Sequence, residues 1–144
     1  MKNQESDLIK QKKRWLKRYR KHKRCIIRLE DKLETLNARL SSVKATTYSG
    51  MPRGGVPIGK DDMVAEKIEL EKRIARLNEK GKRLRNEIIE VIDELEDERY
   101  AMVLESFCID CLELEDIADD KGYSTRQIYR LYSEAVEEVN IMSV

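Results

Sequence analysis

Two long stretches of the chain place apolar or bulky residues alternately four and three positions apart. This spacing is a heptad seam, which predicts an α-helix that packs lengthwise against another helix. The first seam lies within residues 1–43 and consists of Leu8, Lys12, Trp15, Tyr19, His22, Ile26, Leu29, Leu33, Leu36, Leu40 and Val43. The second lies within residues 61–96 and consists of Leu70, Ile74, Leu77, Gly81, Leu84, Ile88, Val91 and Leu95. The pattern predicts two long helices of an all-α protein.

Residues 44–60 interrupt this pattern, because they contain both prolines and four of the six glycines of the chain. No helix continues through such a segment. The simplest arrangement is an antiparallel coiled-coil hairpin that folds back near residue 52, although parallel or swapped pairings remain open. This fold-back places residues 87–98 beside residues 6–17. It also places Gly81 opposite His22 and Tyr19, where the missing side chain leaves room for the two rings.

The last third of the chain, residues 97–144, carries the spacing of a helix-turn-helix. Such a motif needs a small residue where its helices cross, a turn residue that tolerates left-handed dihedrals, and apolar positions in the second helix. Ala118, Gly122, Ile128 and Leu131 meet these needs, and Ala135 and Val139 extend the inward face. Ser124 followed by Gln127 is a capping box that begins the second helix. The alternative is an ordinary helical pair joined by a glycine turn.

The start of that second helix presents an outward polar face. Side chains there could reach base edges and phosphates in a major groove. The candidate DNA contacts on this face are Thr125, Arg126, Tyr129, Arg130 and Ser133.

The run Leu-Glu-Asp-Ile-Ala-Asp-Asp-Lys-Gly-Tyr-Ser-Thr-Arg-Gln-Ile-Tyr-Arg-Leu, which begins at Leu114, resembles the helix-turn-helix of sigma factor region 4. Together with the long charged N-terminal helix and the loop Tyr48–Gly55, it resembles the ArpU-like and region-4-like group of small phage-encoded transcriptional regulators of Gram-positive hosts. The resemblance implies regulation of phage or prophage transcription, of late or packaging genes. It implies DNA contact by Thr125, Arg126 and Tyr129, and also by Arg130.

The net charge of +1 conceals a strong asymmetry. Residues 1–28 hold twelve Lys and Arg against two acids. Lys13, Lys17, Lys21 and Arg24 are candidate phosphate contacts within this stretch. Three interpretations of the basic stretch are open: a solvated face partly neutralised by the acidic run 87–98, a phosphate-binding face, and a membrane-surface helix, which is disfavoured because the apolar face is taken by the seam.

Residues 97–144 hold twelve acids and four bases, a net charge of −8. An isolated module of this charge should bind DNA poorly, because phosphate neutralisation supplies most of the affinity. Either the basic helix of a dimer partner supplies phosphate contacts, or the module docks on RNA polymerase or another protein.

Composition disfavours several classes of fold and function. Charged residues make up 40% of the chain and aromatic residues 6%, which disfavours a thick core or a β-sandwich. No apolar stretch approaches the roughly 18 residues of a membrane span, so we expect a cytoplasmic protein, and the resemblance implies that the cell is a bacterial host. Three cysteines fit a reducing compartment, and Cys108 and Cys111, although spaced as CxxC, are expected to be half-buried helix residues. The one histidine, His22, is expected to be a half-buried seam residue, and we expect no enzyme activity, cofactor or metal site.

The sequence leaves two functional hypotheses of different classes. The first is a regulator that binds double-stranded DNA as a homodimer. The dimer is expected because several apolar positions outside the seams need to be covered, namely Ile9, Leu16, Ile27, Ile89 and Leu114. The alternative is a phage-encoded interaction factor that binds host RNA polymerase, a repressor or a defence protein through the coiled coil or the segment 51–58. That segment is apolar enough either to dock a partner or to fold onto the hairpin.

Overall fold

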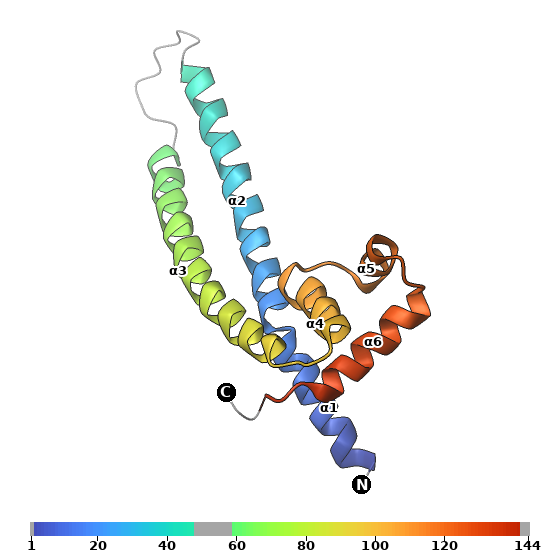
Figure 1. Cartoon of the computed structure of the whole chain (residues 1–144). Helices are drawn as coiled ribbons and strands as arrows, with labels where there is room; N and C mark the ends of the chain where they lie inside the picture. The colour runs from blue at the N-terminus through green and yellow to red at the C-terminus, as the bar shows by residue number, and fades with distance from the viewer. Residues whose placement is uncertain (1, 48–58, 142–144) are drawn as a thin grey trace. The chain divides into compact units, whose positions relative to one another are not determined.

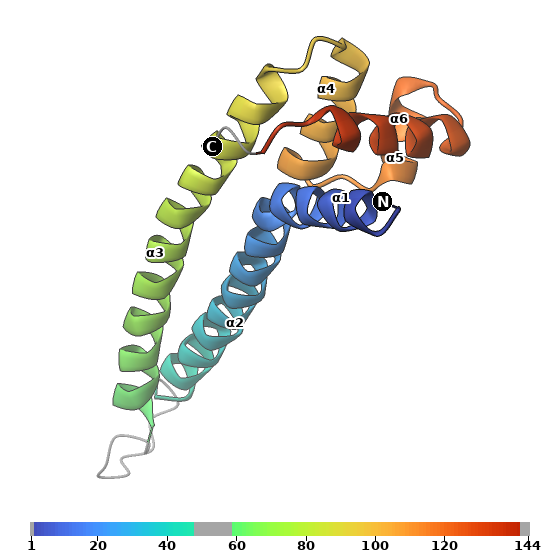
Figure 2. The same cartoon turned by 90° about the horizontal axis from the view of Figure 1, so that it is seen from below.

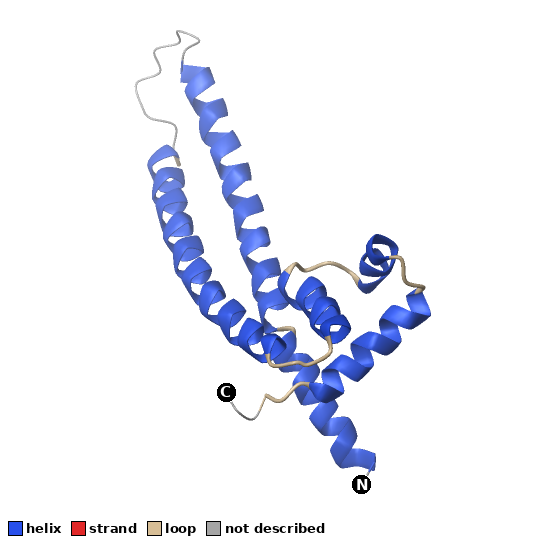
Figure 3. Cartoon of the chain, viewed as in Figure 1, coloured by secondary structure: helices blue, strands red, loops and turns tan. Residues whose placement is uncertain are grey.

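The computed structural model describes residues 2–47 and 59–141, and within these ranges all regular structure is helical, which confirms the all-α prediction (Figure 3). The elements are α1 (Lys2–Leu16), α2 (Arg18–Thr47), α3 (Lys60–Asp93), α4 (Glu98–Leu104), the π-helix η1 (Glu105–Ile109), α5 (Leu114–Lys121) and α6 (Thr125–Glu138) (Figure 1). None of these helices is long and apolar enough to cross a membrane. Residues 48–58, the centre of the predicted loop, lie outside the described residues, and so do the predictions made for them.

The first long helix differs from the predicted span 1–43, because it is interrupted at Lys17 and continues to Thr47. Backbone hydrogen bonds still bridge the interruption, since the Lys17 amide donates to the Lys13 carbonyl and the Lys21 amide donates to the Lys17 carbonyl, each at 3.0 Å. The second long helix ends at Asp93 rather than at residue 96.

The chain forms two compact units, residues 23–80 and residues 1–22 together with 81–144. This division differs from the sequence expectation, which treated residues 97–144 as a module of their own.

The unit of residues 23–80 is the helical hairpin. Its parts of α2 and α3 run side by side in opposite directions (Figures 1 and 2). Leu29, Leu70 and Ile74 form its buried cluster, against which Cys25, Leu33 and Leu77 pack. All of these except Cys25 are seam positions, so the heptad pattern located this contact correctly.

The other unit confirms the register of the fold-back where α2 begins. A methyl group at Gly81 would lie 3.1 Å from Cδ2 of His22 and 3.8 Å from Cε2 of Tyr19, so the glycine does leave room for these rings. Arg18 Nη2 lies 2.9 Å from Glu87 Oε2, which pairs the basic helix with the first acid of the run 87–98. His22 is half-buried, as expected for a seam residue.

Nearer its N-terminus the basic helix does not follow the acidic run. Helix α1 packs on α6 instead, where Lys12 Nζ donates a 2.7 Å hydrogen bond to the Glu137 carbonyl oxygen. The predicted pairing of residues 6–17 with residues 87–98 is therefore wrong for α1. The reason is that α1 buries Leu16, which is 0% exposed, while the seam residue Leu8 stays 41% exposed.

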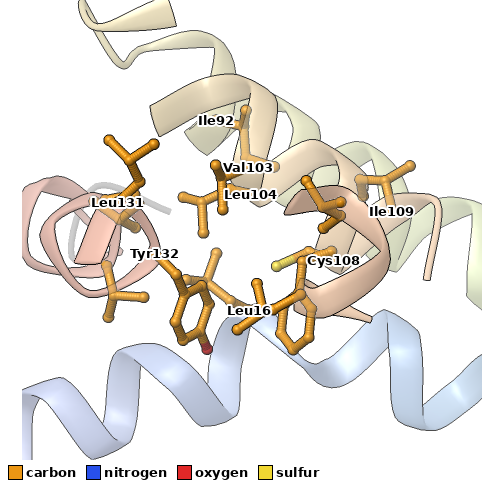
Figure 4. Close-up of a cluster of buried hydrophobic side chains, with 14 of the residues drawn as sticks. Leu16, Ile92, Val103, Leu104, Cys108, Ile109, Leu131 and Tyr132 are labelled. Atoms are coloured by element: carbon orange, nitrogen blue, oxygen red, sulfur yellow. The ribbon is translucent and has the colours of Figure 1, made fainter. Parts of the chain in front are cut away.

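One hydrophobic core joins α1, the end of α3, α4, η1, α5 and α6 (Figure 4). Its largest fully buried side chains are Leu16, Ile88, Leu104, Ile117, Ile128, Val103, Val136, Val139 and Cys108. This core also covers most of the positions from which the sequence predicted a dimer: Leu16 and Leu114 are buried, Ile9 and Ile89 pack against the core, and Ile27 is exposed. The homodimer stays a prediction, but four of its five supporting positions are covered within the chain.

Candidate nucleic-acid interface

A short turn joins α5 to α6. The conformation and hydrogen bonds of this turn explain why α5 ends and α6 begins where they do. Gly122 ends α5 with φ of 77°, a left-handed conformation that favours glycine. The Tyr123 amide donates to the Ala118 carbonyl at 2.9 Å. Ser124 Oγ then accepts from the Gln127 amide at 3.1 Å, while Gln127 Oε1 accepts from the Ser124 amide at 2.9 Å. The predicted glycine turn and capping box are confirmed.

The two helices pack through the predicted apolar positions. Ala118, the small residue of α5, and Ile128 of α6 are 1% and 0% exposed. Leu131, Ala135 and Val139 are likewise buried. The burial of these residues determines which face of α6 packs against the core. The opposite face of α6 therefore points to solvent.

All five predicted contact residues of α6 are exposed, namely Thr125, Arg126, Tyr129, Arg130 and Ser133. The Tyr129 hydroxyl donates a short hydrogen bond to Glu115 Oε1 of α5. This bond lowers the pKa of Glu115 and raises the pKa of Tyr129, because it stabilises the carboxylate and retains the phenolic proton. Arg130 Nε lies 3.7 Å from Glu134 Oε1, an exposed pair that adds little stability.

Three of the four predicted basic contacts lie in the same unit as α6. Lys13 is half-buried, with Nζ 5.8 Å from the ring centroid of Tyr132 of α6. Lys17 and Lys21 are exposed. Arg24 is also exposed but belongs to the hairpin unit.

Sequence reasoning missed Arg20, which is 6% exposed although it carries a charge. Its Nη1 donates to the carbonyl oxygens of Phe107 at 2.7 Å and Leu112 at 2.9 Å, and its Nη2 pairs with Glu113 Oε1 at 2.8 Å. The guanidinium carbon also lies 4.1 Å from the Phe107 ring centroid. Arg20 thus ties α2 to the segment before α5, and nothing in the sequence distinguishes it from the other bases around it.

Packing α1 into this unit changes its electrostatics. Residues 1–22 hold nine bases and two acids, a net charge of +7, whereas residues 81–96 carry −2 and residues 97–144 carry −8. The unit of residues 1–22 and 81–144 therefore has a net charge of −3, so the basic residues 1–22 offset most of its acidity. The acids of α5 remain, however, and Glu115, Asp116, Asp119 and Asp120 are all exposed.

The two spaced cysteines differ in burial. Cys108 is fully buried, rather than half-buried as expected, and burial raises the pKa of its thiol to about 12. Cys111 is half-buried and follows η1 with φ of 61°. Residues 2–47 and 59–141 contain no cluster of His, Cys, Asp or Glu suited to hold a metal ion.

A protein-family model described as "Protein of unknown function (DUF1492)" matches residues 39–140. The chain belongs to this family. The match covers α3 to α6 and the end of α2, but it does not include α1. No curated protein and no solved structure matches the chain.

Proposed function

We propose that the chain is a phage or prophage transcriptional regulator that binds double-stranded DNA with the outward face of α6. The observation that carries this proposal is the exposed polar start of a capped helix whose opposite face is locked into the core. Helix-turn-helix proteins read the major groove with such a helix, whose N-terminal residues approach base edges.

In this proposal the residues divide by role. Arg126 is suited to bidentate contact with guanine, and Thr125 and Ser133 to single hydrogen bonds with bases or phosphates. Tyr129 offers the edge of its ring for contact with DNA, because its hydroxyl donates a hydrogen bond to Glu115. Lys13, Lys17 and Lys21 supply phosphate contacts from α1 and the start of α2, whereas Arg24 belongs to the hairpin unit.

Reversing the charge of both arginines on α6 tests the proposal. The double variant Arg126→Glu, Arg130→Glu should lose measurable binding to a fluorescent duplex of the gene's own upstream region in anisotropy titrations. Both side chains are exposed, so its helicity in circular dichroism should match the wild type.

A matched control reverses two exposed arginines of the hairpin unit, in the variant Arg73→Glu, Arg76→Glu. This control changes net charge equally and should retain most of the duplex affinity. Equal binding by the α6 variant and the wild type would show that α6 does not contact DNA.

The exposed acids of α5 favour a second candidate, an interaction factor that docks on host RNA polymerase. Here Asp116→Lys, Asp119→Lys should weaken binding to purified polymerase in the absence of DNA. Duplex binding by the isolated chain would in contrast improve in this variant, because phosphate repulsion falls.

A further inference from the structure

The hydroxyl of Tyr132 stands out within the core of the α6 unit. The residue is 7% exposed, and its hydroxyl oxygen is buried without a hydrogen-bond partner among the described residues. Figure 4 shows the ring directed toward the helix that carries Leu16, with the hydroxyl at its tip. Buried tyrosine hydroxyls normally find a partner, so one without a partner needs an explanation.

Two lysines of the interrupted basic helix border this ring. Lys13 Nζ lies 5.8 Å from the Tyr132 ring centroid, and Lys17 Nζ lies 5.9 Å from the ring centroid of Phe107. The two rings are themselves in edge-to-face contact, with centroids 5.1 Å apart. One buried hydroxyl and two ammonium groups therefore gather at the junction of α1, α6 and η1.

The ammonium groups of Lys13 and Lys17 differ in their ion pairing from the neighbouring arginine side chains. Arg18 pairs with Glu87 and Arg20 pairs with Glu113, each within 3 Å. No carboxylate within the described part of the chain forms an ion pair with Lys13 or Lys17. The pair of lysines thus carries positive charge that the unit itself does not neutralise.

The hydroxyl is a hydrogen-bond donor throughout the physiological range. Burial, with a smaller contribution from the nearby Cys108, raises the pKa of Tyr132 to about 12. The protonated hydroxyl offers one donor and each ammonium group offers three, which suits an anion with several acceptor oxygens.

We propose that Tyr132, Lys13 and Lys17 form a binding site for one phosphate group at the junction of α1 and α6, and that this phosphate belongs to the DNA backbone. The inference rests on the proposed function and deepens it. Lysine side chains are long and rotate freely, so the two ammonium groups can move from the rings to bind a phosphate whose oxygen accepts from the Tyr132 hydroxyl. A phosphate held there fixes the depth and rotation of α6 in the groove without reading sequence.

Removing only the Tyr132 hydroxyl tests this phosphate site separately from the other proposed DNA contacts. Tyr132→Phe keeps the ring and its packing, so thermal stability should be unchanged or higher, because the unpartnered group is gone. Its affinity for the duplex, measured by anisotropy, should fall by about tenfold, the effect of a hydrogen bond to a charged group. Lys13→Gln should lower the slope of log affinity against log salt by about 1.

Tyr19→Phe is the matched control, since it removes a hydroxyl from another half-buried ring of the same unit. It should bind the duplex as the wild type does. Equal binding by Tyr132→Phe and the wild type would overturn the phosphate site while leaving the proposed function intact. Absence of duplex binding by the wild type would instead overturn the proposed function, and the inference with it.

A second experiment distinguishes a site for DNA backbone phosphate from a site for free inorganic phosphate. Inorganic phosphate is titrated into the ¹⁵N-labelled full chain in the absence of DNA, and amide shifts of residues 13, 17 and 132 are followed. A DNA-backbone site predicts weak, millimolar binding of the ion. Tight saturation at micromolar phosphate would overturn the assignment to DNA and identify a site for the free ion.

Discussion

Replacing Arg20 by alanine is expected to lower the free energy of unfolding by about 3–5 kcal/mol, the summed effect of two lost charged hydrogen bonds and one lost cation–π contact. The substitution leaves the carbonyl oxygens of Phe107 and Leu112 without their donor and removes the cation from the Phe107 ring. Glu113 is less affected, because its side chain is 62% exposed and can be solvated. Urea unfolding followed by the fluorescence of Trp15, the single tryptophan, measures the effect in the relevant unit.

Two further variants sharpen this result. Lys21→Ala removes the adjacent exposed base and should change stability by less than about 0.5 kcal/mol. Arg20→Lys should fall between the wild type and Arg20→Ala, because one ammonium group cannot reach three acceptors in a fixed fork. Identical unfolding curves for Arg20→Ala and Lys21→Ala would refute the role assigned to the guanidinium.

Truncating Leu16 is expected to cause the second large decrease in the free energy of unfolding. Leu16→Ala should cost about 3 kcal/mol, since the side chain is 0% exposed and its removal leaves a cavity in the core shared by α1 and α6. Leu8→Ala deletes the same atoms from a seam residue that is 41% exposed, and should cost about 0.5 kcal/mol or less. Thermal or urea unfolding of the two variants side by side provides the comparison.

The pair also discriminates between two placements of α1. If α1 followed the heptad seam against α3, Leu8→Ala would be the more damaging change. The structure predicts the reverse order, and also predicts weaker duplex binding by Leu16→Ala, because α1 carries Lys13.

Local and periodic features were predictable from the sequence. The seam spacing located the contact around Leu29 and Ile74, and the fold-back near residue 52 placed Gly81 opposite His22. Ser124 and Gly122 set the ends of α6 and α5, because capping and left-handed turns depend on residues close in sequence.

The docking of α1 was not predictable in the same way. A single seam assigns one buried face to the whole helix, whereas the helix is interrupted at Lys17 and buries Leu16 and Arg20 against segments far away in the sequence. Arg20 in the sequence is one of twelve bases in residues 1–28, and only its burial identifies it as structural. The same long-range packing places Lys13 beside the buried ring of Tyr132 of α6.

We propose that one unit, which contains α1 and the C-terminal helices, contacts duplex DNA. The most direct measurement is a titration of the ¹⁵N-labelled full chain with duplex DNA at low salt, with amide shifts assigned residue by residue. Nonspecific binding at roughly 10⁻⁴–10⁻⁶ M is within reach of this method even before the target sequence is known. The account predicts shifts at residues 10–21 and 125–133, with residues 61–80 unchanged. Shifts confined to the hairpin, or no shifts at any residue, would contradict it.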